Sequence, residues 1–176
     1  MMGEPSSSGP VRFPAGYGLP GGAESRVPWS YVEQRLRAAS NYWLTTVGPS
    51  ARPHARPVDG VWVEGALCFG GSPETRWVRN LTANPSVSVN LSSEAEAIIL
   101  EGTAELVTDP CHPLAAPCLA ASKAKYPQYY SAESTPFRPF WALRPTTVFA
   151  WTLANFPRDA TCWRFATEPE QRRRER

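Results

Sequence analysis

Apolar and polar residues alternate with a period of two along much of the chain, as they do in half-buried β-strands. The alternation is clearest at Val87–Leu91, where Ser88 and Asn90 separate three apolar residues. A longer segment contains Gly102, which predicts a bulge or kink because glycine weakens a regular strand. The pattern predicts strands over Asn41–Val47, His54–Val63, Ala66–Phe69, Val87–Leu91, Ala97–Val107, Phe140–Leu143, Val148–Thr152 and Thr161–Phe165.

Helices are predicted at three places between these strands. Ser30–Glu33 has the form of a capping box, which predicts that a helix starts there and runs to about Ala39. Ser72–Glu74 combines an N-cap residue, a proline and an acidic residue, and predicts a second helix that Asn84-Pro85 ends. A third, short helix is predicted at Cys118–Lys125.

The order of these elements predicts a mostly β fold. No strand–helix–strand rhythm occurs, which excludes a parallel sheet, and a closed antiparallel barrel with peripheral helices fits best because closure removes exposed strand edges. With 176 residues, the chain is long enough for one domain. We expect a flexible Gly/Pro/Ser-rich leader at residues 1–26, a folded domain at 27–166 and a charged tail at 167–176.

Composition excludes several classes of protein. An apolar fraction of 42% is typical of globular domains, and no apolar run approaches the roughly 18 residues of a transmembrane helix. The chain starts without a basic-then-apolar signal segment, which predicts a cytoplasmic location. A net charge of +2 does not indicate a nucleic-acid-binding protein. We therefore expect neither a membrane nor a nucleic acid as partner.

The four cysteines do not indicate a metal site. Cys68, Cys111, Cys118 and Cys162 lack the paired close spacing of zinc ligands. Cys111-His112 with Cys118 would supply three ligands, but no residue supplies a matching fourth. We therefore interpret the cysteines as buried or incidental free thiols.

The segment from Cys68 to Pro85 is the strongest candidate for binding chemistry. A short apolar strand ends at Gly70-Gly71, and the predicted helix start follows with Arg76 and Arg79 in its first two turns. Backbone N–H groups and the helix dipole attract a phosphate or carboxylate, and glycine permits its close approach. An ordinary strand–turn–helix with solvated arginines fits the residues equally well.

A series of short motifs then occurs in order: Tyr42-Trp43-Leu44, Arg52–Val58, Arg79-Asn80-Leu81 with Asn84-Pro85, Glu101–Ala104, Phe149–Trp151 and Trp163–Phe165. This series resembles the pyridoxamine 5′-phosphate oxidase-like split β-barrel family, in particular its flavin/deazaflavin (F420)-dependent oxidoreductase branch. The resemblance covers about Trp29–Phe165. It implies an antiparallel six-stranded split β-barrel, a homodimer with a cofactor groove at the subunit interface, and a small-molecule substrate.

The resemblance also implies which residues contact the cofactor. On the second strand they are His54, Arg56, Pro57 and Val58, which would line the ring or tail of the cofactor. At the strand–helix turn they are Gly71, Ser72, Thr75 and Arg76, which would hold its phosphate.

Two further residues of the helix, Trp77 and Arg79, have several possible roles. Arg79 shares a helix face with Arg76, so both could meet one anion, but Arg79 could also hold the dimer or cap a strand. Relatives that bind F420 often carry lysine where this chain has Trp77, so FMN stays open beside F420, which we favour. Trp77 could contact the cofactor, the core or the dimer interface.

We therefore expect a flavin-type-cofactor-binding oxidoreductase that transfers hydride or electrons to or from a small organic substrate. No acid–base constellation identifies a catalytic residue. One alternative is pyridoxamine 5′-phosphate oxidase proper with FMN, which would need a second basic cluster for the substrate phosphate. Others are a non-catalytic cofactor carrier and a haem-binding protein, and haem would need His54 or His112 as iron ligand without a supporting motif.

Overall fold

The structure, a computed structural model, describes residues 4–14, 26–130 and 136–166. Within these ranges no helix is long and apolar enough to span a membrane. The helices are α1 (Trp29–Ala38), α2 (Arg76–Ala83), α3 (Ala115–Lys125) and the 3-10 turn η2 (Pro127–Tyr129). The strands are β1 (Ser7–Pro10), β2 (Tyr42–Val47), β3 (Pro53–Val58), β4 (Gly60–Val63), β5 (Ala66–Phe69), β6 (Ser86–Asn90), β7 (Glu96–Val107), β8 (Phe140–Thr152) and β9 (Thr161–Arg164).

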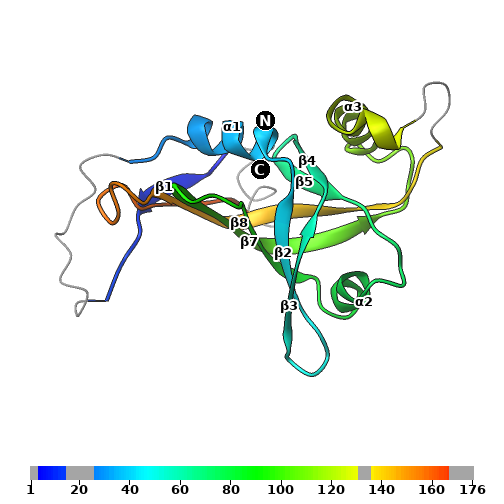
Figure 1. Cartoon of the computed structure of the whole chain (residues 1–176), viewed down its shortest axis with the longest axis horizontal. Helices are drawn as coiled ribbons and strands as arrows, with labels where there is room; N and C mark the ends of the chain where they lie inside the picture. Colours follow the sequence, from blue (N-terminus) through cyan, green and yellow to red (C-terminus); the bar gives the residue numbers. More distant parts are fainter. Residues whose placement is uncertain (1–3, 15–25, 131–135, 167–176) are drawn as a thin grey trace, which may run out of the picture.

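The sheet closes into a barrel (Figure 1), because its strands pair side by side around a ring in which β3 and β4 together count as one strand. β2 pairs with β3 and β6, β6 with β7, β7 with β8, and the first half of β8 with β5, which pairs with β4. β4 follows β3 after a break at Asp59, so the two complete a ring of six strands. The second half of β8 pairs with β9, and β9 with β1. The predicted antiparallel split β-barrel with peripheral helices is confirmed.

The ladder between β7 and β8 contains the bulge that splits the sheet. Its register shifts between Glu101 and Gly102, with Thr146 as the extra residue on β8. A Cβ atom on Gly102 would lie 2.4 Å from the carbonyl oxygen of Arg144, so the close approach requires glycine. Bulges bend a strand, and this one lies where β8 changes its partner from β5 to β9. The bulge predicted at Gly102 is confirmed.

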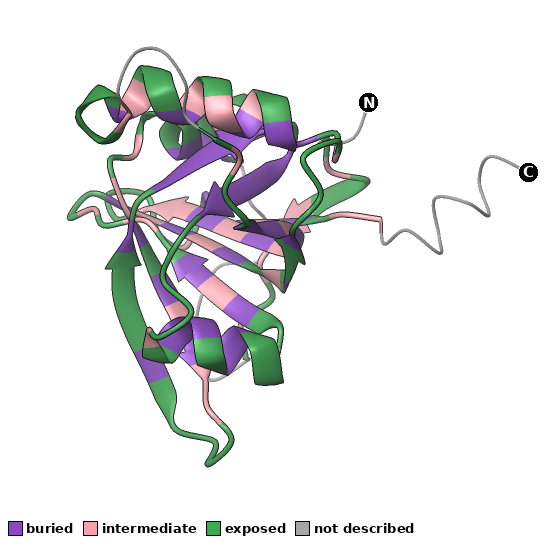
Figure 2. Cartoon of the chain, turned by 90° about the vertical axis from the view of Figure 1, so that its right-hand side faces the viewer, coloured by how far each residue is buried: buried purple, intermediate pink, exposed green. Residues whose placement is uncertain are grey.

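Apolar side chains form two packed layers. The first fills the barrel and continues under α1, whose Val32 and Leu36 are fully buried. The second lies between α3 and the outer face of β4, β5 and the first half of β8. Figure 2 shows the buried residues concentrated along the strands, while the helices expose their outer sides. α3 begins at Ala115 rather than at the predicted Cys118, because Pro117 fits a first turn, where its missing N–H is not needed.

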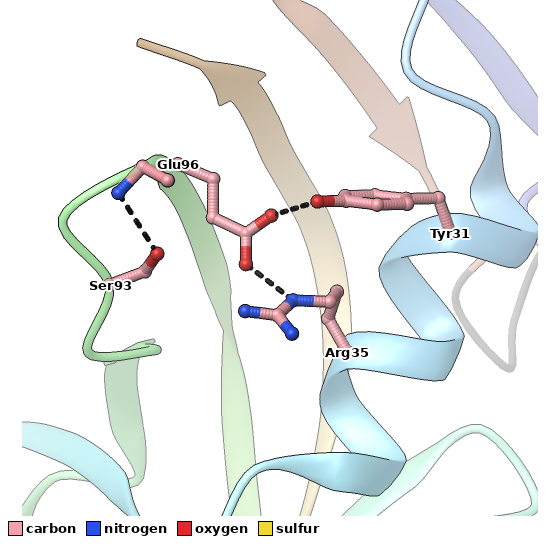
Figure 3. Close-up of polar contacts among 5 residues, drawn as sticks. Tyr31, Arg35, Ser93 and Glu96 are labelled. Carbon is pink, nitrogen blue, oxygen red and sulfur yellow. Dashed lines mark hydrogen bonds and ion pairs between the residues drawn. The ribbon is translucent and has the colours of Figure 1, made fainter.

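A buried carboxylate joins α1 to the long strand β7 (Figure 3). Glu96 is only 6% exposed. It accepts a hydrogen bond from the Tyr31 hydroxyl and forms an ion pair with the Arg35 guanidinium. The hydrogen bond to Glu96 raises the pKa of Tyr31. These contacts fix α1 to the start of β7.

The capping box predicted at Ser30 is not formed. α1 begins at Trp29 with Pro28 as N-cap, two residues before the predicted cap at Ser30, and has no side-chain cap. Glu33 instead accepts a hydrogen bond from Arg37. The helix entry is set by tertiary packing, since Trp29 lies against the rings of three other aromatic residues of the core.

Two of the predicted strand segments have different bounds. Asp59 breaks the segment predicted at His54–Val63 into β3 and β4. Conversely, Phe140–Leu143 and Val148–Thr152 belong to one strand, β8. Pro145, which has no N–H, lies beside the bulge, where a strand tolerates proline.

The segment that we expected to be a flexible leader contains a strand. β1 pairs with β9 from Ser7 opposite Arg164 to Pro10 opposite Thr161. Gly and Pro are depleted in strands, so the residues of β1 do not predict one, and the free edge of β9 supplies the partner. Residues 1–3, 15–25 and 167–176 lie outside the described residues, so the division of the chain at residues 27 and 166 stays a prediction.

Gly102→Ala should lower the free energy of unfolding by about 1–3 kcal/mol, because the new methyl group would overlap the Arg144 carbonyl and shift the bulge. Urea denaturation followed by tryptophan fluorescence measures the loss. Gly9→Ala is the matched control on β1, since a Cβ atom there meets nothing within 4 Å. Equal urea midpoints for the two variants would contradict the role of the bulge.

Candidate functional site

The connection between β5 and α2 is a turn that precedes the helix. The Ser72 carbonyl accepts hydrogen bonds from the Thr75 N–H (3.0 Å) and the Thr75 hydroxyl (2.8 Å), and the Ser72 hydroxyl accepts one from the Glu74 N–H (3.2 Å). The helix itself begins at Arg76, so the start predicted at Ser72 is wrong. The Ser72 hydroxyl, which was predicted to cap the helix, closes this local turn instead. The unpaired N–H groups of the first helical turn therefore begin at Arg76.

Trp77 is part of the core. Its side chain is 7% exposed, and its ring lies 5.7 Å from that of Phe69, centroid to centroid. A Cβ atom on Gly71 would lie 2.1 Å from the indole, so glycine at this position makes room for the ring. Trp77 therefore holds α2 against the end of β5.

A chain of polar contacts places α2 beside β3. Asn80, buried on α2, donates from Nδ2 to Thr46 Oγ1 on β2 at 3.0 Å. The Thr46 hydroxyl in turn donates to the backbone carbonyl of His54 on β3 at 3.4 Å. Asn80 is therefore structural, since its side-chain partner belongs to the barrel.

Positive charge gathers where α2 approaches β3. Burial lowers the pKa of His54, and the guanidinium groups of Arg56 and Arg76 lower it further. His54 is therefore neutral at pH 7. Arg56, Arg76 and Arg79 are exposed, and no carboxylate of the described residues pairs with any of them. This group of unpaired cations is suited to an anion.

The remaining predicted contacts of β3 and the turn lie on different surfaces. Val58 is buried in the barrel, whereas Pro57 is exposed on the outer face, opposite Trp43 of β2. Thr75 is half-buried and engaged in the Ser72 turn. The structure thus brings His54, Arg56 and Arg76 together. Val58 lies further along the same face of β3, whereas Pro57 lies on the opposite face.

A cavity of about 850 Å³ lies between the α3–η2 segment and the ends of β5 and β8. Gly71 and Ser72 line it, and they are the only residues of the predicted site that do. Aromatic side chains dominate the walls, with Asp59, Arg138, two cysteines and a few hydroxyl groups among them. The aromatic residues are Phe69, Tyr126, Tyr129, Tyr130, Phe137, Phe140 and Trp141. The volume and the walls are those of a small-molecule site.

The sequence could not predict this cavity, because its walls come from segments that are distant in the chain, among them β5, α2, the end of β7, α3, η2 and the segment before β8. Within the described residues, no group of three or more His, Cys, Asp or Glu side chains is placed to hold a metal ion. His112 is engaged locally, since its Nδ1 accepts from the Leu114 N–H at 3.2 Å and its Nε2 lies 4.0 Å from Glu105.

A polar network closes the cavity next to Gly60. The Tyr126 hydroxyl accepts from the Gly60 N–H and donates toward the carbonyls of Gly60 and Ser40. Lys125 lies behind it and donates to the Gly60 carbonyl at 2.8 Å and to the Tyr42 hydroxyl at 3.1 Å. Burial lowers the pKa of Lys125 to about 8. The C-terminal end of α3 is therefore fastened to the break between β3 and β4.

Comparisons with known proteins agree with this fold. A family model described as pyridoxamine 5′-phosphate oxidase matches residues 31–152, which is more than half of the chain. No curated protein matches the sequence.

Several solved structures have the same fold. A conserved hypothetical protein from Mycobacterium tuberculosis matches at 18% identity with a TM-score of 0.62, over 74% of this chain and 88% of that chain. A protein described as F420 reductase matches at 23% identity and a TM-score of 0.52, over 66% of this chain and 94% of that chain. A haem-binding protein from Mycobacterium smegmatis matches at 23% identity and a TM-score of 0.56, over 72% of this chain and 55% of that chain. At these identities the likeness shows the fold alone.

The stability of the protein relative to Lys125→Met should rise with pH between about 8 and 9.5. The folded state holds the Lys125 proton less tightly than the unfolded state, so unfolding takes up a proton in this window. Urea denaturation of both proteins at pH 7, 8 and 9 gives the difference in unfolding free energy. A difference that stays flat or falls would show that the lysine is not destabilised by burial.

Proposed function

Because the chain belongs to the pyridoxamine 5′-phosphate oxidase family, we propose that it is an oxidoreductase that binds a flavin-type cofactor, F420 or FMN. It would pass hydride or electrons between this cofactor and a small organic molecule. The observation that carries the proposal is the group of unpaired cations around His54, where Arg56 of β3 meets Arg76 of α2. Both cofactors carry phosphate, and guanidinium groups bind phosphate bidentately.

The residues present fit such a cofactor in three respects. The exposed guanidinium groups of Arg56 and Arg76 have no carboxylate to compete for them among the described residues. The N–H groups of the first turn of α2 lie beside Arg76 and favour an anion. The cavity that begins at Gly71 and Ser72 offers aromatic walls to a planar ring.

Each part of the site would have a separate task. Arg56 and Arg76 would bind the phosphate, and Arg79 would add positive charge at its side. His54, neutral at pH 7, would donate or accept one hydrogen bond to the bound molecule. The cofactor, when bound, supplies the hydride chemistry, while the protein orients it and excludes water. The favoured cofactor is F420, and no side chain is assigned as catalytic acid or base.

We further propose that the active form is a homodimer in which a second copy completes the cofactor groove. Trp43 is 43% exposed on the outer face of β2. It lies between Pro57 of β3 and Asn90 of β6. The outer face of the sheet therefore carries an indole ring and a proline, and that proline follows Arg56 on β3. Large exposed aromatic residues are typical of protein interfaces.

Reconstitution with FMN, F420 and haem, followed by absorbance spectra, tests the cofactor. A band near about 450 nm indicates a flavin and one near about 420 nm a deazaflavin, whereas a Soret band would favour the haem-binding alternative. Turnover of pyridoxamine 5′-phosphate with FMN would favour the oxidase proper, and binding without turnover a carrier. Failure to bind any of them would overturn the proposal.

Arg76→Ala should weaken binding of the reconstituted cofactor roughly ten- to a hundredfold, because one charge-assisted contact to phosphate is lost. Titration calorimetry measures the affinity, and a thermal melt should be almost unchanged because Arg76 is exposed. Arg158→Ala, which removes an exposed arginine from the β8–β9 connection, is the matched control and should bind normally. A large loss of stability with intact binding would make Arg76 structural.

Trp43→Glu should convert dimers into monomers, since a charge would be buried at the centre of the proposed interface. Sedimentation velocity at micromolar concentration gives the assembly state. Leu153→Glu is the control, because Leu153 is 56% exposed but lies in the connection after β8. Wild-type protein that sediments as a monomer in the presence of cofactor would rule out the dimer.

A further inference from the structure

Two cysteines that are distant in the sequence meet in the wall of the cavity. Cys68 lies in β5, opposite Val61 of β4 and Ala142 of β8, and Cys118 lies in the middle of α3. Both belong to the apolar layer between α3 and the barrel, and both line the cavity. Their thiols lie close enough for each to shift the pKa of the other. The packing of α3 on β5 therefore creates a thiol pair that neither segment predicts alone.

The interaction between them makes the pKa values of the two thiols unequal. Cys68, together with the Ser122 hydroxyl, lowers the pKa of Cys118. Cys118 and burial raise the pKa of Cys68. Cys118 is thus the better thiolate, while Cys68 keeps its proton. A low-pKa cysteine beside a second cysteine is the arrangement in which oxidation ends in a disulfide.

The cavity gives these buried thiols access to small molecules. Cys68 is 1% exposed and Cys118 is 8% exposed, and buried thiols without access are inert. The same cavity is lined by Leu106 and Tyr129, which are 49% and 67% exposed, so it opens to solvent. A molecule the size of a peroxide can therefore approach Cys118, the more exposed of the two cysteines, without unfolding of α3.

We propose that Cys68 and Cys118 are an oxidative modification site, which closes a disulfide between β5 and α3 when a hydroperoxide enters the cavity. The Cys118 thiolate attacks one peroxide oxygen, the O–O bond breaks, and Cys118 becomes a sulfenic acid. The Cys68 sulfur then attacks the Cys118 sulfur and displaces its hydroxyl group. The proton of Cys68 leaves with that group as water, so two thiols and one hydrogen peroxide give one disulfide and two waters.

Closing the bond requires a small movement of α3. Sulfur atoms in a disulfide are about 2.05 Å apart, which is closer than two thiols that are not covalently joined. The helix must therefore approach β5 and narrow the cavity from one side. The cross-link also constrains the unfolded chain, so the oxidised protein should have a higher urea midpoint than the reduced protein.

The test uses the full chain with Cys111→Ser and Cys162→Ala, which leaves Cys68 and Cys118 as its only thiols. A small excess of hydrogen peroxide should lower the intact mass by about 2 Da, the mass of two hydrogens. Non-reducing peptide mapping should find the Cys68 and Cys118 peptides joined, and dithiothreitol should separate them. An unchanged mass, or a stable gain of one oxygen without a cross-link, overturns the proposal.

Two further variants separate the roles of the sulfurs. In Cys68→Ala, the sulfenic acid on Cys118 should persist and react with dimedone, because the resolving thiol is gone. In Cys118→Ala, Cys68 should stay reduced under the same conditions. Equal oxidation of Cys68 in that variant would contradict the assignment of Cys118 as nucleophile. Should a variant fail to fold, peptide mapping of the oxidised wild-type chain decides, since links to Cys111 or Cys162 in place of Cys68–Cys118 overturn the proposal.

Discussion

The bulge between β7 and β8 is the constraint on which the rest of the structure depends. Gly102 lets β7 approach the Arg144 carbonyl so closely that the register shifts and β8 bends. The first half of β8 can then pair with β5 and close the barrel, while the second half pairs with β9. Without this bend, the outer face of β5 and β8 would not be free for α3, and the cavity would have no second wall.

Contacts between uncharged side chains set the position of the cationic group around His54. Asn80 and Thr46 bond α2 to the barrel beside His54, and the indole of Trp77 fills the space over Gly71. These contacts fix the start of α2, and with it Arg76, at the edge of β3. Arg56 of β3 and Arg76 of α2 thus both act on the pKa of His54. The neutral side chains that dock α2 set the distance between them.

The sequence predicted those features that depend on local pattern. The alternation at Val87–Leu91 predicted β6, and the glycine at position 102 predicted the bulge in β7, since each signal acts within one segment. The predicted caps at Ser30 and Ser72 failed, because packing of Trp29 and the turn at Ser72 outweigh a weak local preference. The cavity could not be predicted at all, as its walls combine many segments that meet only after folding.

The two features that border the cavity under α3 act on the same helix. At its C-terminal end, Lys125 and Tyr126 fasten α3 to Gly60 through a lysine that burial disfavours in its charged form. In its middle, Cys118 rests on Cys68 of β5. Because α3 forms one wall of the cavity, its docking sets the space available to any bound molecule. A loss of charge at Lys125 and the oxidation proposed for the two cysteines would therefore act on the same wall, because both contacts belong to a single packed helix.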